Sequence, residues 1–267
     1  MIPKLNDFLD LFESIAPSGL AEPWDNPGLQ VGSPFSEVNK VLIALDPTLE
    51  VVSAASRCGA QLLLTHHPLI FAPLSSLDTS KYPGKVISTA LEQGISIISA
   101  HTNLDSAKDG INDILAELLD LQDIRALQDS AETDGSGLGR IGDLPGRLDF
   151  HEFIARVKKI FGLGTIRVAG KLPGSVNRVA VVGGAGSSLL ETACGKGADV
   201  LLTGDVGYHR ALEAGSLGIA VLDGGHFCTE KRAMQVFAER LKDLAGSKDW
   251  EVVFEVDEGE TDPFMCL

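Results

Sequence analysis

Short apolar, β-rich runs alternate with segments of helical periodicity along this chain. In the first half, runs at 41–45, 61–65 and 95–100 are separated by helical patterns that end at Gly59 and Gly94. Strands that alternate with helices usually form a largely parallel sheet whose faces the helices cover. The alternation therefore predicts an α/β protein with parallel or mixed sheets.

The second half repeats the order of the first. CGAQLLLTHHPL matches KGADVLLTGDVG, and GISIISAHTNLD matches GIAVLDGGHFCTE, in each case as a glycine, a strand and then polar residues. Chance similarity among strand–helix units is one explanation, but two matches in the same order favour duplication. We expect two duplicated α/β repeats at 1–121 and 177–267 that close one shared site.

A connecting segment is expected between the repeats, over residues 122–176. Part of it, DSAETDGSGLGRIGDLPG at 129–146, is rich in glycine and acidic residues. Such clusters of glycine and polar residues are typical of loops. We therefore interpret this stretch as a connector or as exposed loops.

Two adjacent histidines, His66 and His67, follow the apolar run in LLLTHHPLIF. Neighbouring side chains in a strand point to opposite faces, so both can reach one site only where the strand has ended, and Pro68 indicates such an end. A lone histidine at a strand end is usually a hydrogen-bonded polar side chain. Two in a row before a strand stop favour metal ligation.

Two further histidines each precede an acidic residue by four positions. The pairs are His101 with Asp105 and His226 with Glu230, and both lie just past predicted strands. Ligands of parallel sheets bind beyond the carboxyl ends of the strands, so these groups converge if the halves face each other. Histidines with carboxylates suit Zn, Fe or Mn, and a carboxylate can bridge two ions.

Two other stretches have more than one interpretation. In AEPWDNPGLQVG, the sequence Asn-Pro-Gly is typical of a turn. Trp24, beside Asp25, could also form part of the wall of a pocket. The glycine-rich VVGGAGSSLL could bind an anion at a helix N-terminus. It matches neither dinucleotide nor P-loop patterns, and close strand–helix packing explains it equally well.

Composition excludes several classes of partner. The formal net charge of −15 argues against general binding of nucleic acid or anionic membranes. No apolar run approaches the roughly 20 residues of a membrane span, and the acidic residues in MIPKLNDFLDLF are unlike a signal peptide. The four cysteines form no CxxC pair, which favours a reduced, cytoplasmic protein.

The motifs AEPWDNPGLQVG, LLLTHHPLIF, SAHTNLDSAKDGIND, LLTGDVGYHRA and GGHFCTE, in this order, resemble the NIF-three-like family of GTP cyclohydrolase type 2 homologues. The resemblance spans nearly the whole chain. It implies that the two α/β repeats are intertwined, and it implies ring-shaped hexamers and a dinuclear metal centre, with Tyr208 and His209 near the same cleft. The ligands it implies are His66, His67, Asp105, His226 and Glu230, with His101 close to the metals.

From these features we expect a hydrolase that uses two divalent ions (Zn, Fe or Mn) on a small-molecule substrate, as a cyclohydrolase or phosphoesterase. His101 is the expected general base, since a metal-bound Glu230 is a poorer one. Five ligands for two ions leave coordination positions open, which favours hydrolysis. Arg210 lies within the motif LLTGDVGYHRA, but the motifs carry few of the basic residues that a triphosphate would need. The alternative is a non-catalytic metal-handling or protein-interaction module.

Overall fold

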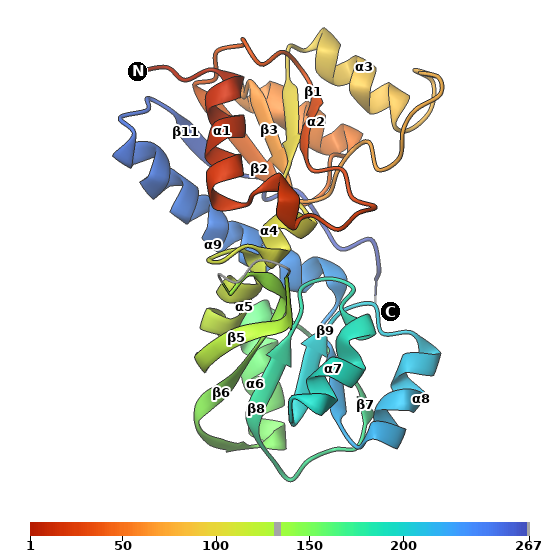
Figure 1. Ribbon diagram of the computed structural model, residues 1–267. Helices are drawn as coiled ribbons and strands as arrows, with labels where there is room; N and C mark the ends of the chain where they lie inside the picture. Colours follow the sequence, from red (N-terminus) through yellow and green to blue (C-terminus); the bar gives the residue numbers. More distant parts are fainter. Residues whose placement is uncertain (131–134, 266–267) are drawn as a thin grey trace. The chain divides into compact units, whose positions relative to one another are not determined.

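The chain forms two compact α/β units, each with its own sheet (Figure 1). The computed structural model describes residues 1–130 and 135–265. Unit 1 comprises Met1–Leu104 and Met234–Leu267, and unit 2 comprises Asp105–Ala233. The chain thus begins in unit 1, builds unit 2 and returns to unit 1, so the two units are interleaved in sequence.

Unit 1 contains a five-stranded sheet in the order β1-β4-β3-β2-β11. Four strands are parallel, and β1 runs antiparallel to β4. The carboxyl ends of the central strands are aligned, because Ala44 pairs with Thr65 and Thr65 pairs with Ser99. The strands are β1 (Gly28–Val31), β2 (Lys40–Ala44), β3 (Leu62–Thr65), β4 (Ser96–Ser99) and β11 (Val253–Val256).

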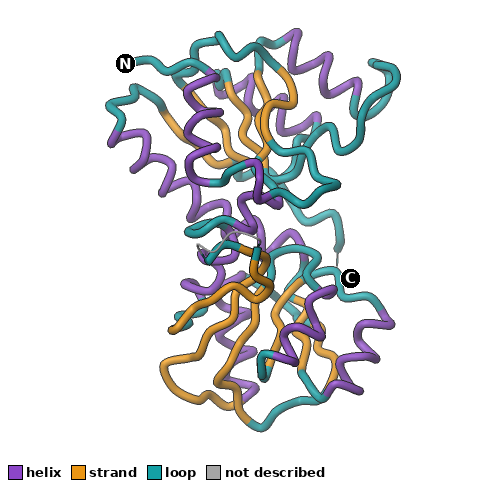
Figure 2. Tube along the Cα trace, in the orientation of Figure 1, coloured by secondary structure: helices purple, strands orange, loops and turns teal. Residues whose placement is uncertain are grey.

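Helices bury the apolar residues of this sheet. Val52 of α2 (Leu49–Cys58) and Ala90 of α3 (Gly84–Glu92) join Leu63 and Ile97 of the strands in one core cluster. On α1 (Leu5–Ile15), Phe8 packs 6.4 Å from the ring of Phe254 in β11. A short 3-10 helix, η1 (Ser18–Leu20), follows α1, and α4 (Thr102–Ser106) follows β4. The alternation of helix and strand can be followed along each unit in Figure 2.

Unit 2 contains a six-stranded sheet in the order β5-β6-β8-β9-β10-β7. Its central strands β8, β9 and β10 are parallel, and the outer pairings are antiparallel. The strands are β5 (Gln122–Asp129), β6 (Gly137–Asp149), β7 (Arg167–Gly170), β8 (Ser175–Val181), β9 (Val200–Thr203) and β10 (Ala220–Asp223). The helices are α5 (Ile111–Leu118), α6 (Phe150–Phe161), η2 (Ser187–Leu189), α7 (Leu190–Gly195) and α8 (Tyr208–Leu217), while α9 (His226–Ser247) starts in unit 2 and ends in unit 1.

The two stretches matched in sequence also match in local structure. Gly59 and Gly197 each end a helical segment before β3 and β9, and both have φ of 76°. Gly94 and Gly218 precede β4 and β10 with φ of 69° and 78°. This left-handed conformation favours glycine, which explains why both matched stretches have glycine at these positions. The predicted α/β class and mixed sheets are confirmed, and the proposed repeat boundaries stay a prediction.

The prediction of loops at 129–146 is wrong over residues 137–146. Gly137–Asp149 forms strand β6, which pairs with β5 and β8. Residues 131–134 of that prediction lie outside the described residues. The glycines of β6 allow close approach instead of a turn: a Cβ on Gly142 would lie 2.7 Å from the backbone oxygen of Gln122.

Within residues 1–130 and 135–265, the structure has no helix whose length and apolar character would let it cross a bilayer.

Candidate metal-binding site

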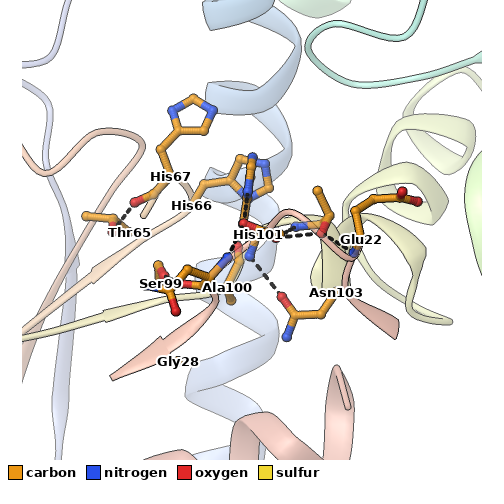
Figure 3. Close-up of polar contacts among 12 residues, drawn as sticks. Glu22, Gly28, Thr65, His66, His67, Ser99, Ala100, His101 and Asn103 are labelled. Carbon is orange, nitrogen blue, oxygen red and sulfur yellow. Dashed lines mark hydrogen bonds and ion pairs between the residues drawn. The ribbon is translucent and has the colours of Figure 1, made fainter. Parts of the chain in front are cut away.

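Three histidines gather at the carboxyl edge of the unit 1 sheet (Figure 3). His66 and His67 directly follow β3, and His101 follows β4, whose carboxyl ends are in register. One ligand atom from each of the three lies within 4.8 Å of the others. The ring centroids are 5.2 Å apart for His66 with either neighbour and 5.4 Å apart for His67 and His101. The end of β3 therefore brings both adjacent imidazoles to one place.

Hydrogen bonds fix the orientation of the first two rings. His66 is fully buried, and its Nδ1 lies 2.8 Å from the backbone oxygen of Ala100. The Nδ1 of His67 lies 2.8 Å from Oδ1 of Asp46. A carbonyl or carboxylate oxygen only accepts, so each Nδ1 donates a proton and each neutral ring carries its lone pair on Nε2. That tautomer is the one in which Nε2 can ligate a metal.

His101 is held in the same way by Asp25. Its Nδ1 lies 2.8 Å from Oδ1 of Asp25, whose side chain is fully buried. The other oxygen, Oδ2, accepts from the amide of Thr102 at 3.0 Å and from its hydroxyl at 2.5 Å. Burial alone would raise the pKa of Asp25, but these hydrogen bonds from His101 and Thr102, with the positive field of His101, lower it to about 2. Asp25 is therefore ionised at neutral pH and orients His101.

Sheet topology explains why these acids reach the histidines. Asp46 lies just past β2, whose last residue Ala44 pairs with Thr65 at the end of β3. Asp25 precedes β1, and because β1 is antiparallel to β4, its beginning lies at the same edge, with Gly28 opposite Ser99. The imidazoles and their carboxylate partners thus come from the segments that directly follow β2, β3 and β4 and from the segment that precedes β1.

A glutamate from the C-terminal segment supports the turn that carries Asp46. Both carboxylate oxygens of Glu260 accept from the amide of Leu45 at 2.9 Å, and Oε1 accepts from the amide of Asp46 at 2.8 Å. Charge-assisted bonds of this kind hold a loop more firmly than neutral ones. Glu260 therefore fixes Asp46, which in turn orients His67.

In unit 2, a histidine and a carboxylate share the first turn of α9. His226 and Glu230 are four residues apart, and His226 Nε2 lies 2.9 Å from Glu230 Oε2. The Nδ1 of His226 lies 2.8 Å from Oδ2 of Asp205, which follows β9. Since Nδ1 donates to Asp205, the short contact between Nε2 and Oε2 joins two electron-pair donors. Such a pair needs a proton or a cation between its atoms.

The backbone at Gly184 crowds the same carboxylate. A Cβ built on this residue, which has φ of 57°, would lie 2.0 Å from Oε1 of Glu230 and 3.0 Å from Nε2 of His226. Only glycine leaves room for the side chains of both His226 and Glu230 there. The close approach defines where the Glu230 carboxylate sits.

The residues predicted as ligands divide between the two units. His66 and His67 belong to unit 1, together with His101, whereas Asp105, His226 and Glu230 belong to unit 2. Asp105 lies in α4, and its backbone oxygen accepts from Nδ2 of Asn112 at 3.0 Å. Imidazoles with carboxylates are the donor set that Zn, Fe and Mn accept, so these residues fit a divalent transition metal.

Two other features serve the fold more than ligand binding. In the glycine-rich turn, the amides of Gly183, Gly184 and Gly186 donate to the side chains of Asn112, Thr229 and Thr203, respectively. This favours the packing interpretation of the turn over anion binding. Arg210 donates to Glu213 at 2.7 Å, so its guanidinium already faces a carboxylate.

Sequence reasoning missed Asp46 and Asp205 as partners of the histidines. Each acid lies 21 residues before its histidine, Asp46 before His67 and Asp205 before His226, a separation too long for local periodicity to connect them. The available signal is positional: Asp46 directly follows the predicted strand at 41–45, and Asp205 is the last residue of the predicted strand DVLLTGD. The sequence suggests Asp25 as a turn residue that could line a pocket with Trp24, but not as the partner of His101.

The fold and these side chains define an α/β protein with oriented histidines that could hold a metal ion. Comparison with known proteins then identifies the family. The sequence model of the family described as Duf34/NIF3 (NGG1p interacting factor 3) matches residues 3–263, and the chain belongs to this family. A Clostridium perfringens protein named GTP cyclohydrolase 1 type 2 homolog is 37% identical over 264 residues, covering 99% of this chain and all of that protein. A Methanocaldococcus jannaschii protein of the same name is 37% identical over 94% of this chain and 98% of its own length. The crystal structure of a Bacillus cereus protein related to NIF3 matches over the full length of both chains, with a TM-score of 0.91 and 31% identity.

Proposed function

We propose that this protein is a cytoplasmic, metal-dependent hydrolase that acts on a small molecule. Two divalent ions would be bound by His66, His67, Asp105, His226 and Glu230. The observation that carries the proposal is the orientation of the histidines. Each of His66, His67, His101 and His226 has Nδ1 against an oxygen that only accepts. Metal-binding histidines almost always have such a partner on the ring nitrogen that does not ligate.

The chemistry of the donors supports hydrolysis over a purely structural role. A divalent ion bound by these residues supplies Lewis acidity and lowers the pKa of a coordinated water toward about 7. His66 and His67 would hold the metal through Nε2, and Glu230, which is 4% exposed, would add a carboxylate. Five protein ligands for two ions leave positions open to solvent and substrate, as catalytic sites require.

His101 is the candidate general base. Asp25 accepts a hydrogen bond from Nδ1 of His101, which leaves the lone pair of Nε2 to take a proton from the attacking water. Its imidazole is 13% exposed, so solvent and substrate can reach it. The buried Asp25 would hold the ring in this tautomer and stabilise the imidazolium that forms, as a carboxylate does for other catalytic histidines.

The substrate class follows partly from the relatives. Several are named GTP cyclohydrolase 1 type 2 homolog, which supports hydrolysis of a C–N bond in a heterocyclic ring, with a phosphoester as the other candidate bond. The ion pair between Arg210 and Glu213 argues against Arg210 as a dedicated triphosphate ligand. We therefore propose that recognition depends on the reacting group more than on a polyphosphate.

The test combines metal analysis with an activity screen. Protein purified without chelator should contain about two divalent ions per chain, as two-metal hydrolases do. It is then assayed against nucleotides, phosphoesters and cyclic amides. His67→Ala should lower both metal content and turnover. His101→Ala should keep the metal and lower turnover by about 10²- to 10⁴-fold. His151→Ala, which removes an exposed histidine of α6, is the matched control and should change neither.

Each role can be contradicted separately. Loss of metal from His101→Ala would make His101 a ligand and exclude it as the base. Full metal content in Asp105→Ala would remove Asp105 from the ligand set. A chain that binds both ions but hydrolyses none of the compounds would instead be a metal-handling or partner-binding protein.

A further inference from the structure

Two large aromatic side chains are exposed beside the histidines of unit 1. Trp24 and Phe71 are 54% and 55% exposed, although aromatic residues usually bury most of their surface. Their ring centroids are 5.5 Å apart, and the rings are tilted by 34°. The centroid of Trp24 is also 6.0 Å from that of His101, in an edge contact. Exposed ring surface therefore lies next to the candidate general base.

Hydrogen bonds hold the two segments that carry these rings. Nδ2 of Asn26, two residues after Trp24, donates to the backbone oxygen of Ile70 at 2.6 Å. The buried Gln30 connects the same two segments, since its Nε2 donates to the oxygen of Asn26 at 2.7 Å and its Oε1 accepts from the amide of Ile70 at 3.0 Å. The rings are thus exposed on a backbone that is ordered before any ligand binds.

The turn is also fastened to the histidine side of the sheet. Asp25, next to Trp24, accepts from both His101 and Thr102, and the amide of Glu22 donates to the hydroxyl of Thr102 at 2.9 Å. Whatever contacts the exposed face of Trp24 is therefore held at a fixed position relative to His101. A binding surface with that property positions a substrate and does not merely adhere to it.

We propose that Trp24 and Phe71 form a stacking platform for a flat heteroaromatic ring in the substrate. Aromatic rings pair with centroids 4.5–7 Å apart, so a ring stacked on this platform would contact Trp24, whose own centroid is 6.0 Å from that of His101. The side chain of Asp25, the residue next to Trp24, is fully buried. This inference rests on the proposed function and names its substrate class. It makes Trp24 and Phe71 specificity residues.

The test measures ring binding apart from turnover. Guanosine is the probe, and inorganic triphosphate is the probe without a ring, both titrated into the full-length, metal-loaded protein by calorimetry. Stacking of one base on an aromatic side chain corresponds to roughly fivefold to 100-fold in affinity. Trp24→Ala and Phe71→Ala should weaken guanosine binding by that factor and leave triphosphate unchanged. Trp24→Phe should restore most of the affinity.

Phe35→Ala is the matched control, because Phe35 is 79% exposed in the same unit but lies outside the platform. It should bind guanosine as the parent does. The platform would be overturned if the parent showed no saturable binding of guanosine, or if Trp24→Ala and Phe71→Ala bound guanosine with the affinity of the parent. A lower oligomeric mass of the double variant in light scattering would assign the two rings to a contact between copies, and would overturn it too.

The two proposals fail in different ways. If the metal and turnover experiments succeed while both alanine variants bind guanosine normally, the hydrolase stands and the platform is wrong. If both variants lose guanosine binding in a chain that turns over no compound, the platform stands and the hydrolase is wrong.

Discussion

Asp46 is the residue through which the metal-binding role of unit 1 can be tested without removing a ligand. It accepts from Nδ1 of His67 and would act on a metal only by orienting that ring. Loss of such a partner typically costs 10- to 100-fold in metal affinity. We expect Asp46→Ala to weaken Zn²⁺ binding by about 10- to 100-fold, and Asp46→Asn, which keeps an accepting oxygen, to weaken it less. Competition with a chromophoric chelator measures the affinity.

Asp10→Ala is the matched control, because Asp10 is an exposed carboxylate of α1 whose side chain accepts from Asn6. It removes the same charge from the same unit and should leave Zn²⁺ affinity unchanged. Equal affinities of Asp46→Ala and the parent would mean that His67 does not need this partner, and the argument from histidine orientation would lose its support in unit 1.

Single residues show how far sequence reasoning reaches. Adjacent histidines before a proline form a local signal, so His66 and His67 were predicted as a pair that reaches one place, as the structure shows. Their partners Asp46 and Ala100 come from neighbouring strands, and that proximity depends on sheet order. Sheet order is a non-local property that residue spacing does not encode.

At the scale of elements, periodicity predicted the helices and the buried strands but misread β6. Its glycines and acids are typical of loops, yet the strand lies between β5 and β8. Gly139 and Gly142 are there because neighbouring atoms leave no space for a side chain: a Cβ on Gly139 would lie 2.8 Å from Cγ2 of Val182. Composition cannot separate a glycine that permits a turn from one that permits close packing.

This interpretation of β6 predicts a stability difference between two glycines of the same strand. In Gly142→Ala, the added methyl group would meet the backbone oxygen of Gln122 at 2.7 Å, whereas a Cβ on Gly146 meets nothing within 4 Å. Overpacking of a buried position typically costs 1–3 kcal/mol. We expect Gly142→Ala to lower the free energy of unfolding by about 1–3 kcal/mol and Gly146→Ala to change it little. Urea unfolding measures both, and equal midpoints would contradict the packing role.

At the scale of the whole molecule, the C-terminal segment shows what a sequence pattern leaves open. Strand β11 pairs in parallel with β2, with Val253 opposite Lys40, although more than 200 residues separate them. Periodicity identifies short strands but does not say which sheet each one joins. The interleaving of the two units therefore follows from long-range pairing, and only the resemblance to a family pointed to it in advance.

Assembly is the remaining prediction at this scale, and it rests on the family resemblance, which implies a ring-shaped hexamer. Exposed aromatic side chains such as Phe35, Tyr208 and Phe264, which are 79%, 73% and 80% exposed, are of the kind that subunit interfaces bury. Each copy carries a formal net charge of −15, so association must overcome repulsion between chains. Salt screens that repulsion, since the Debye length falls from about 30 Å at 0.01 M to about 3 Å at 1 M.

We therefore expect light scattering at micromolar concentration to give six times the chain mass of 28.2 kDa, with the hexamer favoured as ionic strength rises. An assembly held by apolar surface against like charge should lose subunits at low salt, whereas one held by ion pairs should lose them at high salt. The opposite salt dependence would place charged pairs at the interfaces. A monomer at every ionic strength would rule out the hexamer, and a stable dimer would restrict the assembly to a single two-fold contact.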